Sequence, residues 1–191
     1  MEEMKNNSGS NIKGSRQDIS GIVCTCTYQS PCGTLLLGSL DDKLCLCDWA
    51  DAPHRLSVDR RLAQALRTVY RPLPSAVTDE AIRQLDEYFG GKRHQFTVPL
   101  RFIGTTFQQS VWNRLLEIPY GMTVSYGELA ELVGKPHSVR AVAKACAANA
   151  ISIFAPCHRV IGADGVATGY AGGSSAKKFL LDLEQKTVRN L

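Results

Sequence analysis

Residues 125–148 have the sequence Ser-Tyr-Gly-Glu-Leu-Ala-Glu-Leu-Val-Gly-Lys-Pro-His-Ser-Val-Arg-Ala-Val-Ala-Lys-Ala-Cys-Ala-Ala. Ser125 and Glu128 form the pattern of a capping box, so we expect a helix to begin there and to end at Gly134. Ser138 is expected to cap a second helix that reaches about residue 148. Two short helices joined by a glycine-containing turn predict a helix-turn-helix.

The second of these helices is rich in alanine and carries two basic side chains, Arg140 and Lys144. High helix propensity or close packing against a neighbouring element would explain the alanines. A thin helix could also enter a groove of DNA, with the basic side chains reaching phosphates or the base stack. The residues themselves leave both interpretations open.

A candidate nucleophile follows in the sequence Ala155-Pro156-Cys157-His158-Arg159-Val160. A cysteine beside cationic groups is nucleophilic at neutral pH, whereas a cysteine in apolar surroundings is inert. Because side chains adjacent in sequence need not face each other, a buried and unreactive Cys157 is the alternative. For the Cys157-His158 pair alone the unreactive interpretation is favoured, and the elements placed around this stretch are what raise the reactive one.

The first half of the chain contains no pattern that suggests catalysis. Residues 1–18 are polar and lack an apolar period, which predicts a disordered tail. Residues 19–49 alternate short β-branched or aliphatic runs with turn residues, which predicts a three-stranded meander. Cys-x-Cys pairs at 24–26 and 45–47 fit a packed sheet, whereas metal sites usually take Cys-x-x-Cys, so we predict no metal.

Two helices and a further strand are expected next. Apolar spacing predicts an amphipathic helix over 59–71 and another over 78–90, the second one capped by Thr78. Residues 94–99 read as one more strand. The pattern then changes from strand to helix near 98–105, where we place a domain boundary.

Local motifs predict the remaining elements. A second capping box over 106–109 begins a helix. Residues 160–166 read as a short hairpin and 169–173 as a glycine loop that could let backbone approach a ligand closely. The last helix is expected to begin at Ser174 or Ser175. Its buried face is expected to contain Phe179, Leu180 and Leu183.

The composition of the 191-residue chain, 44% hydrophobic and 21% charged, is that of an ordinary globular protein. No apolar run could span a bilayer and no secretion signal is recognisable, so we expect no membrane partner. Seven cysteines without the spacing of a disulfide framework favour a reducing compartment, and we predict a cytoplasmic protein. The formal net charge of +4 permits nucleic-acid binding without demanding it.

The second half resembles the O6-alkylguanine-DNA alkyltransferases, or methylated-DNA–protein-cysteine methyltransferases. The matching pieces occur in family order and cover nearly all of 104–184. They are Gly104-Thr105-Thr106-Phe107-Gln108, Val111-Trp112, Ile118-Pro119-Tyr120-Gly121, Ser125-Tyr126, Arg140-Ala141-Val142, Asn149, Pro156-Cys157-His158-Arg159-Val160-Ile161, Gly169-Tyr170-Ala171-Gly172-Gly173 and Leu180-Leu181-Asp182-Leu183-Glu184. The first half is similar more loosely, through Ser30-Pro31-Cys32-Gly33-Thr34-Leu35.

The resemblance implies an α+β protein of two domains. Residues 19–103 would form a small N-terminal domain of β-meander and helices, ribonuclease H-like in the family. Residues 104–191 would form a mostly α-helical, winged-helix-like domain that contains the helix-turn-helix, binds DNA and accepts the alkyl group.

The resemblance also implies direct DNA repair. Such a protein binds the minor groove through its helix-turn-helix and flips O6-alkylguanine, or O4-alkylthymine, out of the duplex. It then transfers the alkyl group irreversibly to its own cysteine, so each molecule acts once. The expected partner is double-stranded DNA that contains O6-alkylguanine. No cofactor is expected, and the protein is expected to act as a monomer.

Residue by residue, the resemblance assigns two groups of positions. Cys157 would be the nucleophile and acceptor, His158 a base acting through water, and Glu184 the group that orients His158. Asn149 would hold the turn before the cysteine, and Tyr126 would assist flipping and stabilise the leaving guanine. The expected contacts to DNA and the flipped base come from Arg140, which would fill the gap in the duplex, and from Ala141, Lys144, Tyr126, Tyr170 and Ala171. Ser152 and Thr168 would border the alkyl pocket, and Arg159 is expected to be structural.

Three other functions fit parts of the sequence. A lesion-binding relative that flips the base without transfer has tryptophan at the cysteine position, which Cys157 argues against. A regulator of the family would carry an added zinc-binding domain, for which this chain has no room. A thiol hydrolase could use Cys157, His158 and Glu184, but the alanine-rich helix with Arg140 would then be unexplained.

Overall fold

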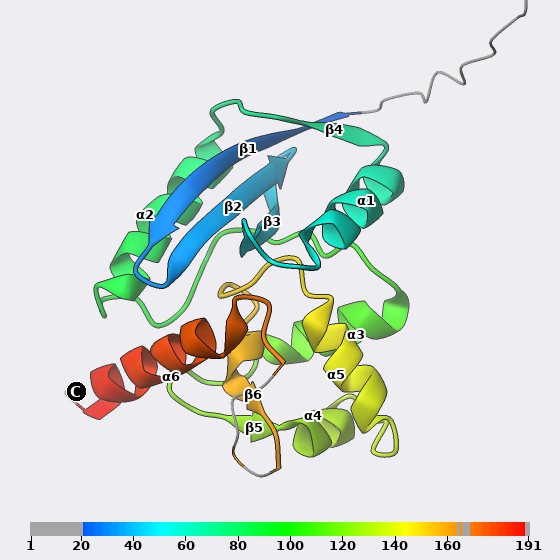
Figure 1. Ribbon diagram of the computed structural model, residues 1–191, viewed down its shortest axis with the longest axis vertical. Helices are drawn as coiled ribbons and strands as arrows, with labels where there is room; N and C mark the ends of the chain where they lie inside the picture. Colours follow the sequence, from blue (N-terminus) through cyan, green and yellow to red (C-terminus); the bar gives the residue numbers. More distant parts are fainter. Residues whose placement is uncertain (1–20, 164, 166–168, 190–191) are drawn as a thin grey trace, which may run out of the picture.

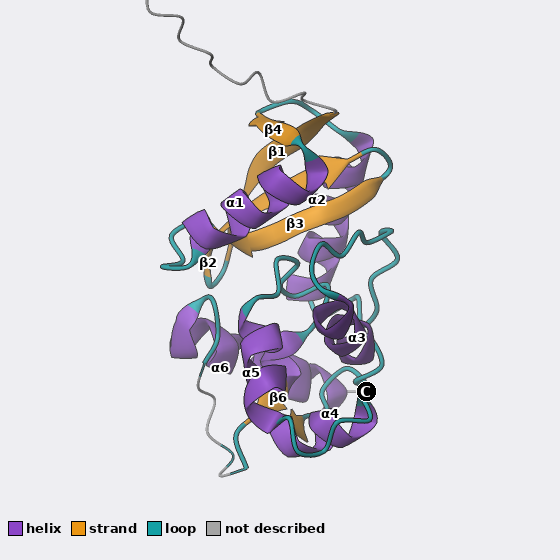
Figure 2. Cartoon of the chain, turned by 90° about the vertical axis from the view of Figure 1, so that its right-hand side faces the viewer, coloured by secondary structure: helices purple, strands orange, loops and turns teal. Residues whose placement is uncertain are grey.

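The computed structural model describes residues 21–163, 165 and 169–189, which form a sheet-containing part and a helical part stacked on each other (Figure 1). Figure 2 shows the same two layers from the side. Together they make the predicted α+β fold. The tail expected at 1–18 and Thr168 lie outside the described residues.

A four-stranded sheet forms the centre of the first part within the described residues. β1 (Gly21–Ser30), β2 (Gly33–Leu40) and β3 (Lys43–Trp49) make the predicted antiparallel meander. β4 (Thr68–Arg71) pairs in parallel with β1, and the resulting order is β3-β2-β1-β4. β3 therefore lies at the edge of the sheet.

One helix covers each face of this sheet. Successive side chains of a strand point to opposite faces. Leu35 and Leu37 of β2 pack with α2 (Ala76–Phe89), whereas the neighbouring Leu36 packs with α1 (Arg55–Leu66) on the other side. The alternation of the apolar residues thus places α1 and α2 on opposite faces.

Two expectations for these helices were wrong. The helix expected over 59–71 ends at Leu66, because Arg67 adopts a left-handed φ of 50° and the β-branched run after it joins the sheet as β4. Ser75 rather than Thr78 caps α2, since its hydroxyl accepts from Val77 N at 3.2 Å. Strand pairing therefore determines where α1 ends, and the backbone geometry of the cap determines where α2 begins.

The strand expected at 94–99 was also wrong. This segment is irregular, and its end runs along the edge of β3, where Leu44 N donates to Pro99 O at 2.9 Å and Arg101 N donates to Leu44 O at 2.8 Å. Leu100 makes an isolated bridge to Leu44. The edge strand therefore holds the connection between the two parts.

The helical part is built around a second core that includes Trp112, Leu129, Val142 and Val160. Its elements are α3 (Thr106–Leu115), β5 (Val124–Ser125), α4 (Tyr126–Leu132), α5 (Val139–Ala147), the 3-10 turn η1 (Cys157–Arg159), β6 (Val160–Ile161) and α6 (Gly173–Arg189). α4 and α5 contact each other in the way expected of a helix-turn-helix. β6 pairs in parallel with β5, and the hairpin expected over 160–166 includes residues 164 and 166, which lie outside the described part.

Capping in the helical part agrees with the sequence in one place and differs in others. The box of Ser125 and Glu128 is present in both directions. The box expected over 106–109 lies one residue earlier, between Thr105 and Gln108. Ser138 stands at the start of α5 but makes no side-chain capping bond among the described residues.

The last helix also starts earlier than expected. α6 begins at Gly173, before either expected serine. Leu180 on its inner face is fully buried, whereas Phe179, expected beside it, is 37% exposed. The buried face of α6 is therefore turned away from Phe179.

The segment before the cysteine docks on the same edge strand. Cys47 N of β3 donates to Ala150 O at 2.8 Å, and Ser152 N donates back to Cys47 O at 2.6 Å. Ile153 and Phe154 are buried in the core beneath the sheet. The sheet-containing part thus positions the loop that carries Cys157.

Candidate active site

Cys157 lies at the start of η1 and is 6% exposed. Asn149, just after α5, donates from Nδ2 to Ala155 O at 2.9 Å and to the Cys157 sulfur at 3.4 Å. Its Oδ1 accepts from Ile151 N at 3.0 Å. The buried amide therefore ties the end of α5 to the thiol.

The thiol is protonated at neutral pH. Burial raises the pKa of Cys157 to about 11, while the Asn149 hydrogen bond and the positive charge of Lys177 act in the opposite direction. His158 and Arg159 do not supply the expected lowering of this pKa, because both side chains point to Glu184. Since the thiolate is the nucleophile, a base has to remove the proton.

Lys177 of α6 is a buried cation near the thiol that the sequence reading missed. Its Nζ donates to Val160 O at 2.6 Å and lies 5.9 Å from the centre of the Tyr126 ring. Desolvation lowers the pKa of Lys177, and the Cys157 charge opposes that change. The buried face of the helix contains three residues at the spacing i, i+3 and i+7, namely Lys177, Leu180 and Glu184. This spacing could have indicated from the sequence that Lys177 is buried.

His158 has the geometry of a general base. Its side chain is fully buried, and Nε2 lies 2.8 Å from Glu184 Oε1. A proton on Nε2 makes Nδ1 the acceptor nitrogen, and Nδ1 has no hydrogen-bond partner among the described residues. Burial lowers the pKa of His158 and Glu184 opposes that change, so the imidazole is neutral at neutral pH.

Five donor groups of the described residues converge on the Glu184 carboxylate. Oε1 accepts from His158, from Tyr88 Oη at 2.7 Å and from Arg159 Nη2 at 3.0 Å. Oε2 accepts from Arg159 Nε and from Gly121 N, both at 2.9 Å. Burial opposes the charged form, but His158 and Arg159 outweigh it and lower the pKa of Glu184 to about 2.

Arg159, expected to be merely structural, is the counter-ion of this carboxylate. Its guanidinium grips both oxygens of Glu184, and Nη1 also donates to Ile118 O at 2.6 Å. A two-point arginine–carboxylate contact fixes orientation as well as charge. The sequence offered no signal for this contact, because it depends on the packing of α6 against η1.

The residues expected at the base pocket gather around the thiol. Tyr126 belongs to the same core cluster as Cys157, and burial raises the pKa of its hydroxyl to about 12. The Tyr170 ring lies 6.3 Å from the His158 ring, with the half-buried Ala171 next in the chain. A Cβ added at Gly169 would lie 3.6 Å from the Tyr126 hydroxyl, so this loop reaches α4.

The glycine loop makes its closest approach to the sheet-containing part. A Cβ at Gly172 would lie 2.3 Å from the indole of Trp49 at the end of β3. Glycine at position 172 is therefore required for packing against Trp49, and the ligand contact that the sequence suggested for this loop stays a prediction.

The predicted DNA contacts of α5 share its exposed face. Arg140, Ala141 and Lys144 are exposed, whereas Val142 and Ala145 are buried. Trp112 donates from its indole to Ala145 O at 2.8 Å. Close packing thus explains the alanines of the inner face, and the outer face combines small side chains with two cations.

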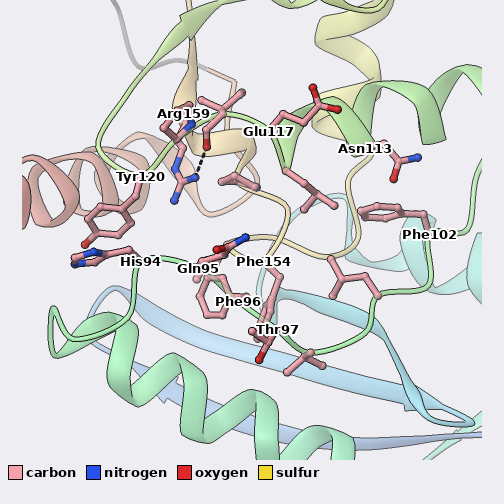
Figure 3. Close-up of a pocket in the computed structure, with 17 residues that line it drawn as sticks. His94, Gln95, Phe96, Thr97, Phe102, Asn113, Glu117, Tyr120, Phe154 and Arg159 are labelled. Atoms are coloured by element: carbon pink, nitrogen blue, oxygen red, sulfur yellow. Dashed lines mark hydrogen bonds between the residues drawn. The ribbon is translucent and has the colours of Figure 1, made fainter.

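A cavity of about 710 Å³ lies behind the cysteine loop, between the two parts of the molecule (Figure 3). His94, Phe96, Phe102, Tyr120, Phe154 and Arg159 contribute to its walls. Among the described residues, Cys157 and His158 do not line it, so this cavity is distinct from the thiol site.

Two kinds of feature are absent from the described part of the chain, a metal centre and a membrane-spanning helix. No cluster of three or more His, Cys, Asp or Glu residues there could hold a metal ion. None of the described helices is long and apolar enough to cross a membrane.

Comparison with known families defines the class of the protein. Residues 106–186 match the DNA-binding domain of 6-O-methylguanine DNA methyltransferase, and residues 23–102 match its ribonuclease-like domain. The protein is therefore a methyltransferase, with its thiol site inside the first of these matches.

Individual relatives narrow the assignment. A methylated-DNA–protein-cysteine methyltransferase of Methanosarcina barkeri is 42% identical over 161 residues, covering 84% of this chain and 96% of that protein. The crystal structure of Mycobacterium tuberculosis O6-methylguanine methyltransferase is 40% identical with a TM-score of 0.73, covering 86% of this chain and 94% of that one. A second structure, M. tuberculosis OGT in complex with DNA, is 38% identical with the same TM-score of 0.73 and covers 87% and 94%. The chain belongs to the methylated-DNA–protein-cysteine methyltransferase family.

Proposed function

We propose that the chain repairs DNA by moving the alkyl group of O6-alkylguanine, and of O4-alkylthymine, onto its own Cys157. The observation that carries this proposal is a buried thiol followed directly in the chain by a buried His158, whose Nδ1 has no hydrogen-bond partner among the described residues. Membership of the family supports the assignment. Residues 19–103 and 104–191 would act as two domains of a monomer, the second one binding DNA.

The reaction is a displacement at the alkyl carbon. His158 Nδ1 takes the thiol proton through a bridging water, and Glu184 stabilises the imidazolium that results. The sulfur–carbon bond forms as the bond from carbon to O6 breaks. Tyr126 donates a hydrogen bond to the guanine as negative charge develops on it. The guanine then takes one proton from solvent, the imidazolium releases one, and the thioether remains on Cys157.

DNA recognition would use the exposed face of α5 in the minor groove. The target base has to leave the stack to reach a buried thiol, which costs a few kcal/mol. Arg140 would fill the gap and offset part of that cost, while Ala141 and Lys144 contact the backbone. Asn149 would hold the turn, and Tyr170 and Ala171 would line the pocket for the flipped base.

The first test uses two cysteine variants of one buried cluster, Cys157→Ala and Cys146→Ala. Each protein is incubated with a duplex that carries O6-methylguanine, and peptide mass spectrometry locates any added methyl group. We expect one methyl on Cys157 in the wild type and in the Cys146 variant. The Cys157 variant should bind the duplex and leave the lesion intact, and transfer by this variant would refute the assignment.

A further inference from the structure

Tyr88 brings the sheet-containing part of the molecule into the thiol site. It lies near the end of α2, is fully buried, and donates from its hydroxyl to Glu184 Oε1 at 2.7 Å. The Tyr88 hydroxyl oxygen also lies 3.5 Å from His158 Nε2. In Figure 1 the end of α2 lies beside α6, and the Phe89–Phe179 ring contact at 6.4 Å confirms this neighbourhood.

Aromatic neighbours hold the Tyr88 ring in place. The rings of Phe89 and Phe96 each lie 5.3 Å from it, and Tyr120 lies at 6.0 Å. These contacts are made by the ring and would be kept by phenylalanine. A buried tyrosine hydroxyl needs a hydrogen-bond partner, and here that partner is the carboxylate that holds His158.

The hydroxyl competes with His158 for one carboxylate oxygen. A donor on Oε1 draws negative charge away from the imidazole and so disfavours the protonated ring. Among the described residues, the titratable and charged groups around His158 are Glu184 and Lys177 from α6, Arg159 from η1, Tyr170 from the loop before α6, and Tyr88 from α2, with Cys157 next to it in the chain. Of the charged groups that shift the pKa of His158, Arg159 and Lys177 disfavour the imidazolium and Glu184 favours it.

We propose that Tyr88 is a positioning residue for alkyl transfer, which fixes the Glu184 carboxylate and so holds the neutral imidazole of His158 in place to accept the thiol proton. This inference rests on the proposed function of His158. It gives the sheet-containing part a role in the chemistry in addition to its role in packing.

The test compares Tyr88→Phe with Tyr28→Phe. Tyr28 is a matched control, since its hydroxyl also donates to a carboxylate of α2, Asp86 at 2.8 Å, but at an exposed position. The single-turnover rate of methyl transfer is measured from pH 5 to 9 at saturating duplex. The titration of His158 is followed by NMR of histidine-labelled protein, and duplex affinity is measured in parallel.

For Tyr88→Phe we expect a maximal rate about 3- to 10-fold lower and unchanged duplex affinity. Without the Tyr88 hydrogen bond, the Glu184 carboxylate should stabilise the imidazolium more strongly. The midpoint of the His158 titration and the acid limb of the rate profile should therefore both move to higher pH by about half a unit. Tyr28→Phe should match the wild type in every measurement.

Two outcomes would overturn the inference. One is a Tyr88→Phe variant that transfers methyl at the wild-type rate with the wild-type pH dependence. The other is a slow or unstable Tyr88→Phe protein whose His158 titrates as in the wild type, which would mark a packing role. Failure of the wild type to methylate Cys157 would instead refute the proposed function, and the His158 titration would still decide the role of Tyr88.

Discussion

At Cys157, burial and charge oppose each other. Burial raises the pKa of the thiol, and Lys177 partly offsets that effect from inside the protein. A buried thiol is protected from adventitious reaction, because the thiolate forms when a base and a cation assist it. In the proposed mechanism the resting thiol is therefore unreactive until His158 takes its proton.

Replacing Lys177 by methionine tests the electrostatic part of this account. Loss of the positive charge should raise the pKa of Cys157 by about one unit, since a nearby cation favours the thiolate. The rate of iodoacetamide labelling at Cys157, read by peptide mass spectrometry across pH, should move to higher pH by the same amount.

Lys178→Met is the matched control for this prediction. Lys178 is the next residue of α6 and pairs with Asp182 on the surface, where its side chain is 72% exposed. The same change of net charge at that position should leave the labelling profile unchanged. An equal shift in both variants would contradict a local effect of Lys177.

At this scale the sequence predicted the candidate reacting groups, whereas it did not predict the groups that contact them in the structure. Cys157, His158 and Glu184 are carried by motifs, and the structure brings the last two into contact. The roles of Tyr88 and Arg159 arise from tertiary packing, because Tyr88 is 96 positions from Glu184. No local pattern records a contact over that separation.

At the scale of elements, the proposed role of α5 in DNA recognition can be tested through Arg140. Arg140→Ala should slow repair of a duplex by about tenfold or more, since an inserted or phosphate-bound arginine contributes that much. Reaction with free O6-methylguanine base should be unchanged, because Arg140 is exposed and does not belong to the buried cluster that contains Cys157. The rates are measured by methyl incorporation into Cys157.

Arg114→Ala provides the control for Arg140. Arg114 is an exposed arginine of α3 that pairs with Glu117, so its loss changes the net charge equally. Its variant should repair duplex at the wild-type rate. If duplex and free base lose rate equally in Arg140→Ala, the flipping role is wrong.

Element boundaries were predictable where local groups fix them. Ser125 and Glu128 cap α4 with their own side chains, and the sequence placed that start correctly. The predicted end of the helix over 59–71 was wrong, because the last four of these residues pair with β1 and form β4. Apolar residues fit either a helical or a strand period in so short a run, and the partner strand decides.

For the whole molecule, the contact of Trp49 with Gly172 is the sharpest test of how the two parts fit. A Cβ at Gly172 would lie 2.3 Å from the indole. Gly172→Ala should therefore lower the free energy of unfolding by about 1–3 kcal/mol, the usual cost of an overpacked contact. Thermal or denaturant unfolding measures the change.

Gly127→Ala is the control for that substitution. Gly127 lies within α4, and the nearest atom to an added Cβ is Ser125 Oγ at 3.6 Å. Alanine there should be neutral or stabilising by up to about 1 kcal/mol, because it favours the helix. A Gly172 variant as stable as the wild type would show that the Trp49 side chain accommodates the methyl group at no cost, and would contradict a tight fit here.

The carboxylate of Glu184 has a consequence beyond a single molecule. It takes hydrogen bonds from α2, from η1 and from the turn at Gly121, so a change in one part alters what the other tolerates. Replacing one part without the other would disturb the set of donors around Glu184, so the two parts are expected to be exchangeable only together.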